Sequence, residues 1–118
     1  MSNYIAITDR TKQFALRIIK AYGWLKEQNE ECKIIGKQLF RSSTSVGAMV
    51  REAQSAQSNR DFISKLEIGA KEIRESQYWI ELLIESELVP KERFQPLLNE
   101  ANEIGKILVA STKKLKQK

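Results

Sequence analysis

The chain has 118 residues and a net charge of +5, with 42% hydrophobic and 30% charged residues. This length suits one domain that buries a core without metals or disulfides, and the composition excludes a disordered chain. The sequence has no histidine and one cysteine, Cys32, so it lacks the commonest general base, the commonest metal ligand and any intrachain disulfide. We therefore expect a binding protein rather than an enzyme, with no cofactor and no metal.

No segment has the pattern of a secretion signal or a membrane span. Residues 1–8 lack a basic region followed by an apolar stretch, so we expect no signal peptide. The longest apolar runs, such as residues 107–110, are far too short to cross a bilayer. A single cysteine also fits a reducing compartment, so these features favour a cytoplasmic protein with no membrane partner.

Four segments repeat apolar residues at helical spacing, and none alternates as a strand does. The first predicted helix spans residues 9–28, where Thr8 or Asp9 is placed to cap the start. Its apolar stripe contains Phe14, Ile18, Ala21 and Leu25.

The second predicted helix spans residues 31–57. Its stripe contains Ile35, Leu39, Ser42, Val46, Met49, Ala53 and Ala56, and a neighbouring line contains Phe40, Ser43, Gly47 and Val50. The serine-rich run 41–45 has the composition of a loop, but the helical spacing continues in phase across it. We expect one continuous helix, with a break near Ser43 as the alternative.

The third predicted helix spans residues 59–87, and Ser58 with Asp61 resembles a capping box at its start. Its stripe contains Phe62, Leu66, Gly69, Ile73, Ser76, Ile80 and Leu83. The fourth spans residues 91–115, with a stripe of Leu97, Ala101, Ile104, Leu108, Ser111 and Leu115. Because Pro96 lacks an N–H and clashes with the preceding turn, we expect the regular part of this helix to begin near Phe94.

Short connections make successive helices antiparallel neighbours. The sequence therefore predicts a single all-α domain over residues 1–118, an antiparallel up-down-up-down four-helix bundle. Aromatic residues outside the stripes, close to small residues, favour a second packing surface and hence a homo-oligomer. Trp24 and Trp79 are our candidates for the oligomer interface.

Positive charge is concentrated in the first and last quarters. Residues 9–28 carry +3, 30–57 carry +1, 58–87 carry −3 and 90–118 carry +4. If the first and fourth helices are neighbours, their outer faces merge into a patch that binds phosphates, beside Tyr22 and Trp24 as base-stacking residues. The candidate nucleic-acid-binding residues are Arg10, Lys12, Arg17, Lys20, Lys26, Lys106, Lys113, Lys114, Lys116 and Lys118. A merely solvated helix end is the alternative.

The serine, glutamate and cysteine side chains that could take part in catalysis are better explained by structural roles. The serines of residues 42–45 have no base partner, so we expect close helix contact rather than catalysis. Glu72 and Glu75 share one face of the third helix, where paired carboxylates are far more often solvated or salt-bridged than catalytic. Cys32 follows Glu30 and Glu31, which disfavour its thiolate. We assign no catalytic residue.

Three segments carry a family resemblance: RSSTSVGAMVREA at 41–53, DFISKL at 61–66 and KEIRESQYWI at 71–80. They resemble the four-helix-bundle family of ribosomal-RNA intervening-sequence proteins, which are encoded within insertions in 23S ribosomal RNA genes of some bacteria and elsewhere in bacterial genomes. The resemblance covers roughly residues 9–115. The positions that it singles out are Arg41, Ser45, Glu52, Phe62, Glu72, Glu75, Tyr78 and Trp79.

The resemblance implies more than a fold. The family includes the accessory variability determinant of diversity-generating retroelements, a basic pentameric bundle that associates with a reverse transcriptase and nucleic acid. A pentamer that binds RNA or DNA within a ribonucleoprotein is therefore implied here, with a protein–protein scaffold as the alternative. Met49 and Arg51 depart from the family, which often has asparagine and alanine there. Any contact that rests on that asparagine is missing from this chain.

Overall fold

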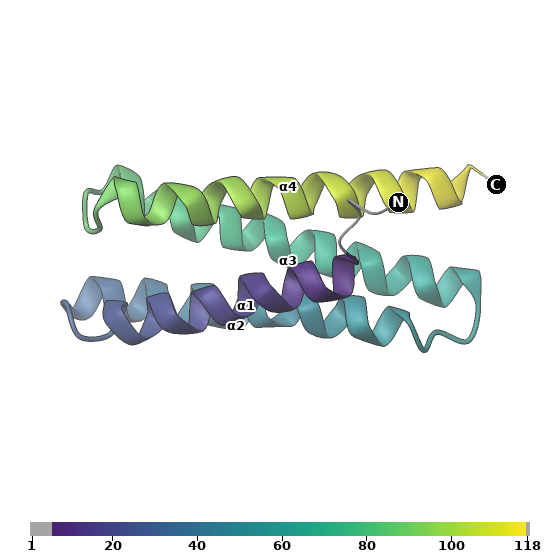
Figure 1. Cartoon of the computed structure of the whole chain (residues 1–118), viewed down its shortest axis with the longest axis horizontal. Coiled ribbons are helices and arrows are strands. Elements are labelled where there is room, and N and C mark those ends of the chain that lie inside the picture. Colours follow the sequence, from purple (N-terminus) through teal and green to yellow (C-terminus); the bar gives the residue numbers. More distant parts are fainter. Residues whose placement is uncertain (1–5, 118) are drawn as a thin grey trace.

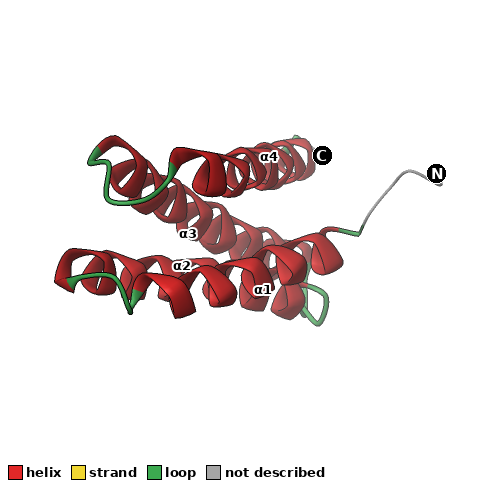
Figure 2. Ribbon diagram, turned by 60° about the vertical axis from the view of Figure 1, so that its left-hand side comes forward, coloured by secondary structure: helices red, strands yellow, loops and turns green. Residues whose placement is uncertain are grey.

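The computed structural model describes residues 6–117 as four long helices joined by short loops (Figure 1). The helices are α1 (Ile7–Leu25), α2 (Glu30–Ala53), α3 (Asn59–Glu85) and α4 (Lys91–Lys116). No strand occurs among these residues, as Figure 2 shows. The predicted all-α class is confirmed, and α2 runs through the serine-rich segment 41–45 without a break.

Each helix packs against two neighbours in an antiparallel ring. α1 and α3 both contact α2 and α4. The α1–α2 and α3–α4 loops lie at one end of the 47 Å bundle, while the start of α1, the α2–α3 loop and the end of α4 lie toward the other end (Figure 1). The α2–α3 contact is the most extensive and the α1–α4 contact the least. The up-down-up-down prediction is confirmed.

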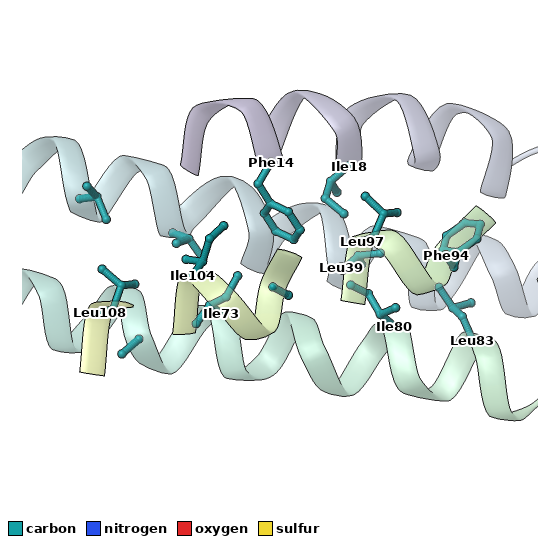
Figure 3. Close-up of a cluster of buried hydrophobic side chains, with 14 of the residues drawn as sticks. Phe14, Ile18, Leu39, Ile73, Ile80, Leu83, Phe94, Leu97, Ile104 and Leu108 are labelled. Carbon is teal, nitrogen blue, oxygen red and sulfur yellow. The ribbon is translucent and has the colours of Figure 1, made fainter. Parts of the chain in front are cut away.

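Most residues of the predicted stripes form the core, although Ile35, Met49 and Ser111 are only half-buried. Figure 3 shows side chains from all four helices in this core, including Phe14, Ile18, Leu39, Ile73, Ile80 and Ile104, each at most 1% exposed. Full burial of such a side chain contributes about 1.5–3 kcal/mol to folding. Because α2 packs against both α1 and α3, it also buries Ser43 and Val50 from the neighbouring line.

The start of the first helix was predicted wrongly. α1 begins at Ile7, and its N-cap residue Ala6 makes no side-chain capping bond. Thr8 and Asp9 lie inside the first turn, so neither is the cap. The reason is packing: Ile7 lies against the core, and with buried Thr11 it extends the stripe by about two turns toward the N-terminus.

Side-chain caps fix the starts of the two central helices. The Ser58 hydroxyl accepts a hydrogen bond from the Asp61 N–H at 3.1 Å, as the capping-box pattern predicts. The Asp61 carboxylate reaches the Gln57 N–H at 3.3 Å rather than that of Ser58. At α2, the Asn29 side chain accepts from the Cys32 N–H at 2.8 Å.

The end of α3 uses a glutamate where helices usually have glycine. Glu87 has φ 62°, in the left-handed region. The Leu88 N–H donates to the Leu83 carbonyl at 3.2 Å and the Glu87 N–H to the Ile84 carbonyl at 3.0 Å, the two bonds of a Schellman motif. These bonds end the helix two residues before the predicted boundary at 87.

The fourth helix begins earlier than its proline indicated. α4 starts at Lys91 and contains Pro96, so a regular start near Phe94 was wrong. Pro96 lies in the second turn, where its missing N–H costs a single backbone bond. Phe94 and Leu97 on either side are both buried, and their packing holds the helix through the proline.

Three serines form a polar layer inside the α2–α3 contact. Ser42, Ser43 and Ser76 are each 0% exposed. The Ser76 hydroxyl lies 2.7 Å from that of Ser42 and 2.8 Å from that of Ser43, and the Ser42 hydroxyl donates to the Leu39 carbonyl at 3.3 Å. Since each hydroxyl has one proton, the consistent chain is Ser43 to Ser76, Ser76 to Ser42, and Ser42 to the carbonyl. Close helix contact through small residues was the prediction for this segment.

Candidate nucleic-acid interface

The bundle is electrically polarised along its length. When each helix is divided at its midpoint, the half of the bundle that contains the α2–α3 loop is basic. This basic half has ten basic and five acidic residues, a net charge of +5, and consists of residues 6–16, 42–72 and 104–117. The other half, residues 17–41 and 73–103, has nine basic and ten acidic residues, a net charge of −1. This acidic half ends at the α1–α2 and α3–α4 loops (Figure 1). An anionic partner is attracted to the basic half.

Ion pairs neutralise several of the candidate binding residues. The Arg10 guanidinium donates to both Glu100 oxygens at 2.7 and 3.0 Å, which raises the pKa of Arg10. Lys106 lies 3.4 Å from Glu103, and Lys116 is paired with Glu67. These cations are less available to phosphates than the sequence alone suggested. Lys118 lies outside the described residues.

The remaining candidates do not share one face. Arg17 and Lys20 line an α1–α4 groove of about 450 Å³ with Trp24 and Arg93, in the acidic half. Lys26 lies over the ring of Tyr22, 5.9 Å from its centroid. α1 and α4 are neighbours, as the merged patch required, but their cations are distributed over several seams of the bundle.

The aromatic residues beside these cations have covered faces. The Arg93 guanidinium lies 5.0 Å from the centroid of the Trp24 ring. Tyr22 is stacked on Phe40 at 5.3 Å between ring centroids, with an interplanar angle of 11°. Base stacking needs a free ring face, so neither residue is a ready platform for a nucleobase.

Three cations gather around Thr8 at the start of α1. Lys12 and Arg51 line a hollow of about 220 Å³ between α1 and α2, which Thr8 also lines. Lys114 lines the adjoining hollow between α1, α3 and α4, again with Thr8. Lys12, Arg51 and Lys114 are exposed, and across residues 6–117 none of them has a carboxylate at ion-pair distance. We call these three cations the Thr8 patch.

Arg51 was missed as a binding residue by sequence reasoning. It stood out only as a departure from the family, which often has alanine there. Gly47, one helical turn before Arg51, lies close to α1: a Cβ added there would be 3.5 Å from the Thr11 hydroxyl. Arg51 is on the same side of α2 and therefore also lies beside α1. The α1–α2 packing thus brings Arg51 next to Lys12, which no local pattern reports.

Four of the family-motif residues form a polar clamp between α2 and α3: Arg41, Glu72, Glu75 and Trp79. Arg41 donates to Glu75 at 2.7 Å and to Glu72 at 3.3 Å, while the Trp79 indole N–H donates to Glu75 at 3.1 Å. The Arg41 hydrogen bond, then that of Trp79, lowers the pKa of Glu75, and the same carboxylates raise the pKa of Arg41. The expected salt-bridged carboxylate face is confirmed.

The other motif positions surround this clamp or lie apart from it. The Ser45 hydroxyl donates to the Arg41 carbonyl at 2.8 Å, and the rings of Tyr78 and Trp79 lie 5.1 Å apart. Phe62 packs against the core, and Glu52 is exposed. Trp79 is half-buried within its own chain, as is Trp24 against Phe94 at 6.1 Å. Their place in an oligomer interface stays a prediction.

Cys32 is enclosed by the bundle. Its side chain is buried, and its sulfur lies 3.8 Å from the Leu88 carbonyl. Burial, and then the charge of Glu31, raises the pKa of the thiol. A protonated, enclosed thiol is a poor nucleophile, which agrees with the inert cysteine expected from the sequence.

Within residues 6–117, no three acidic or cysteine side chains converge as a set of metal ligands. None of the four helices described here combines the length and apolar character that a membrane span requires.

The fold and its charges define a class of protein: a charge-polarised antiparallel four-helix bundle with a polar clamp between its two central helices. The sequence model of the family described as 23S rRNA-intervening sequence protein matches residues 4–110, and the chain belongs to this family. It is similar to a crystal structure of a protein with unknown function from the S23 ribosomal protein family of Bacteroides thetaiotaomicron VPI-5482. The two are 43% identical, with a TM-score of 0.86 over 92% of this chain and 99% of that one. No curated protein matches.

Proposed function

We propose that this chain is a non-catalytic, cytoplasmic, homo-oligomeric bundle that binds nucleic acid through its basic half. The Thr8 patch is the observation that carries the proposal. Lys12, Arg51 and Lys114 lie around one point of the surface, and no carboxylate of residues 6–117 lies at ion-pair distance from any of them. Cations without a carboxylate partner are available to bind phosphates of a nucleic acid, and this binding releases the counterions condensed on it.

The mode of binding is backbone recognition. Tyr22 and Trp24 have covered ring faces, and the hollow that Lys12 and Arg51 line contains no aromatic residue. Phosphate contacts supply affinity without sequence information. RNA and DNA, single- and double-stranded, should therefore bind alike, with little sequence preference.

Self-assembly strengthens this mode. Three cations per chain make a weak site, but a ring repeats the patch in every subunit, so the contacts act together through avidity. The family resemblance favours five subunits and a setting within a ribonucleoprotein. With about four duplex phosphates neutralised, the slope of log K against log salt is about −4.

A matched pair of double variants tests the patch. K12Q/R51Q removes two cations of the basic half. K33Q/K37Q removes the same charge from exposed positions of α2 in the acidic half, where no carboxylate of residues 6–117 lies at ion-pair distance. Binding of a fluorescein-labelled RNA hairpin and DNA duplex is measured by anisotropy at several salt concentrations. K12Q/R51Q should flatten the duplex slope by at least about 2, because each lost phosphate contact removes about 0.9 and every subunit of the ring loses two cations. K33Q/K37Q should leave the slope unchanged.

Three results would contradict the proposal: no binding at low salt, equal effects of both variants, or a strong preference for one sequence. The first favours the scaffold alternative, in which the charge serves solubility or an acidic protein partner. The second places the interface outside the Thr8 patch. Far-UV circular dichroism of each variant checks that the helices are intact.

A further inference from the structure

A groove lies between α3 and α4, on the opposite side of the bundle from the α1–α2 hollow that Lys12 and Arg51 line. The groove has a volume of about 590 Å³, and Ala70 and Ile73 of α3 lie in it opposite Gly105, Val109 and Ala110 of α4. Val109 is 48% exposed, while Ile73 is buried beneath it. Small residues on both helices leave this hollow, because longer side chains there would fill the seam.

The bottom of the groove is closed. The Gln77 amide donates to the Ala101 carbonyl across the seam at 3.3 Å. A Cβ at Gly105 would lie 3.1 Å from the Gln77 amide nitrogen and 3.6 Å from Ile73, so glycine leaves room for the Gln77 amide in this position. An occupant therefore rests on a fixed surface and does not enter the core.

Cations stand on both sides of this apolar surface. Arg74 lies on the α3 side, and Lys106 and Lys113 lie on the α4 side, two turns apart, or roughly 10 Å. Arg74 and Lys113 have no carboxylate at ion-pair distance in the described part of the chain. The Lys106–Glu103 pair is 3.4 Å long, with side chains 76% and 52% exposed, so it is easily exchanged.

We propose that the α3–α4 groove docks an acidic amphipathic helix of a partner protein. Apolar side chains at positions i, i+4 and i+7 would cover Val109 and the alanines, and flanking Glu or Asp would pair with Arg74 and Lys113. The small floor residues let the backbone of the partner helix approach, as a fifth helix laid into the seam. The partner is recognised by apolar contact and opposite charge together.

Two other occupants fit the groove less well. A nucleic acid would find an aliphatic floor with no aromatic residue on which a base could stack. The α1 face of a second copy, where the exposed apolar pair Leu16 and Ile19 is flanked by Lys12 and Lys20, would bring these lysines against the cations of the groove. Apolar contact and charge together favour an acidic amphipathic helix over nucleic acid and over this α1 face.

The test uses a phage-displayed library of amphipathic helices of about five turns. Apolar residues are fixed on one face, and the flanking positions vary among Glu, Gln and Lys. Selection on the full-length protein should enrich Glu at the flanks. The enriched peptide, labelled with fluorescein, should bind V109D and R74E/K113E at least about tenfold more weakly, because each variant opposes one of the two recognition elements. The matching peptide with Lys at the flanks should prefer R74E/K113E, and a variant that gains a ligand has not merely unfolded.

Four results would overturn the proposal: no enrichment of Glu, unchanged affinity for V109D, displacement of the peptide by an oligonucleotide, or a fall in oligomer mass in V109D. The third would make the groove a nucleic-acid site and the fourth a subunit interface. K12Q/R51Q should bind the peptide like the unmodified protein. Peptide binding and nucleic-acid binding can therefore fail independently of each other.

Discussion

The buried serine chain between α2 and α3 makes a quantitative prediction about stability. Replacing Ser76 with alanine removes two hydrogen bonds, of 2.7 and 2.8 Å, from a site that is 0% exposed. Each such bond contributes about 0.5–1.5 kcal/mol, and the Ser43 proton loses its acceptor. Alanine returns about 0.5 kcal/mol through its higher helix propensity. We expect S76A to lower the free energy of unfolding by about 1–2 kcal/mol.

A triple variant distinguishes the loss of the hydrogen bonds from the cost of leaving a buried hydroxyl without a hydrogen-bond partner. In S42A/S43A/S76A no hydroxyl remains to be left without a partner, and removing all members of a buried network is less costly than removing one. The triple variant should therefore be at least as stable as S76A. Both are measured by urea denaturation followed by far-UV circular dichroism, with an unchanged m-value as the control. A loss below about 0.5 kcal/mol in S76A, or additive losses in the triple variant, would refute this account.

Three further predictions concern the clamp, a helix end and assembly. E75Q should lower stability by about 0.5 kcal/mol at neutral pH, since solvent screens the Arg41 pair. Because the pKa of Glu75 is lowered, the stability difference between E75Q and the unmodified protein should reach its full size above about pH 5 and disappear as the pH falls through that pKa. A stability difference that does not change with pH would refute this prediction. E87G should raise the free energy of unfolding by about 0.5 kcal/mol by relieving the left-handed glutamate, with E87A as a control that removes the carboxylate but keeps the Cβ. Light scattering on a sizing column should give several times 13.6 kDa, with five subunits as our first expectation, and a stable monomer at micromolar concentration would contradict it.

Local chemistry was enough to find the helices and their inner faces. The period of apolar residues placed Ile18, Leu39 and Ile104 in the core, and it correctly overruled the loop-like composition of residues 41–45. Ser58 was found as a cap because a capping bond joins residues three apart. Predictions failed where packing between helices outweighed a rule based on neighbouring residues. Packing of Ile7 against the core places the start of α1 before the predicted cap, and burial of the residues around Pro96 keeps α4 helical through the proline.

The availability of charge, by contrast, was decided by tertiary structure. Arg10 and Lys12 are two residues apart and looked equivalent, yet Arg10 is held by Glu100, which lies 90 positions away, while Lys12 lines a hollow with Arg51. The sequence by itself determined a four-helix bundle, its core and its family, because periodicity and caps act within a few turns of one helix. Which cations are neutralised, which aromatic faces are covered and which seams are hollow depend on side chains that meet only when different helices pack together.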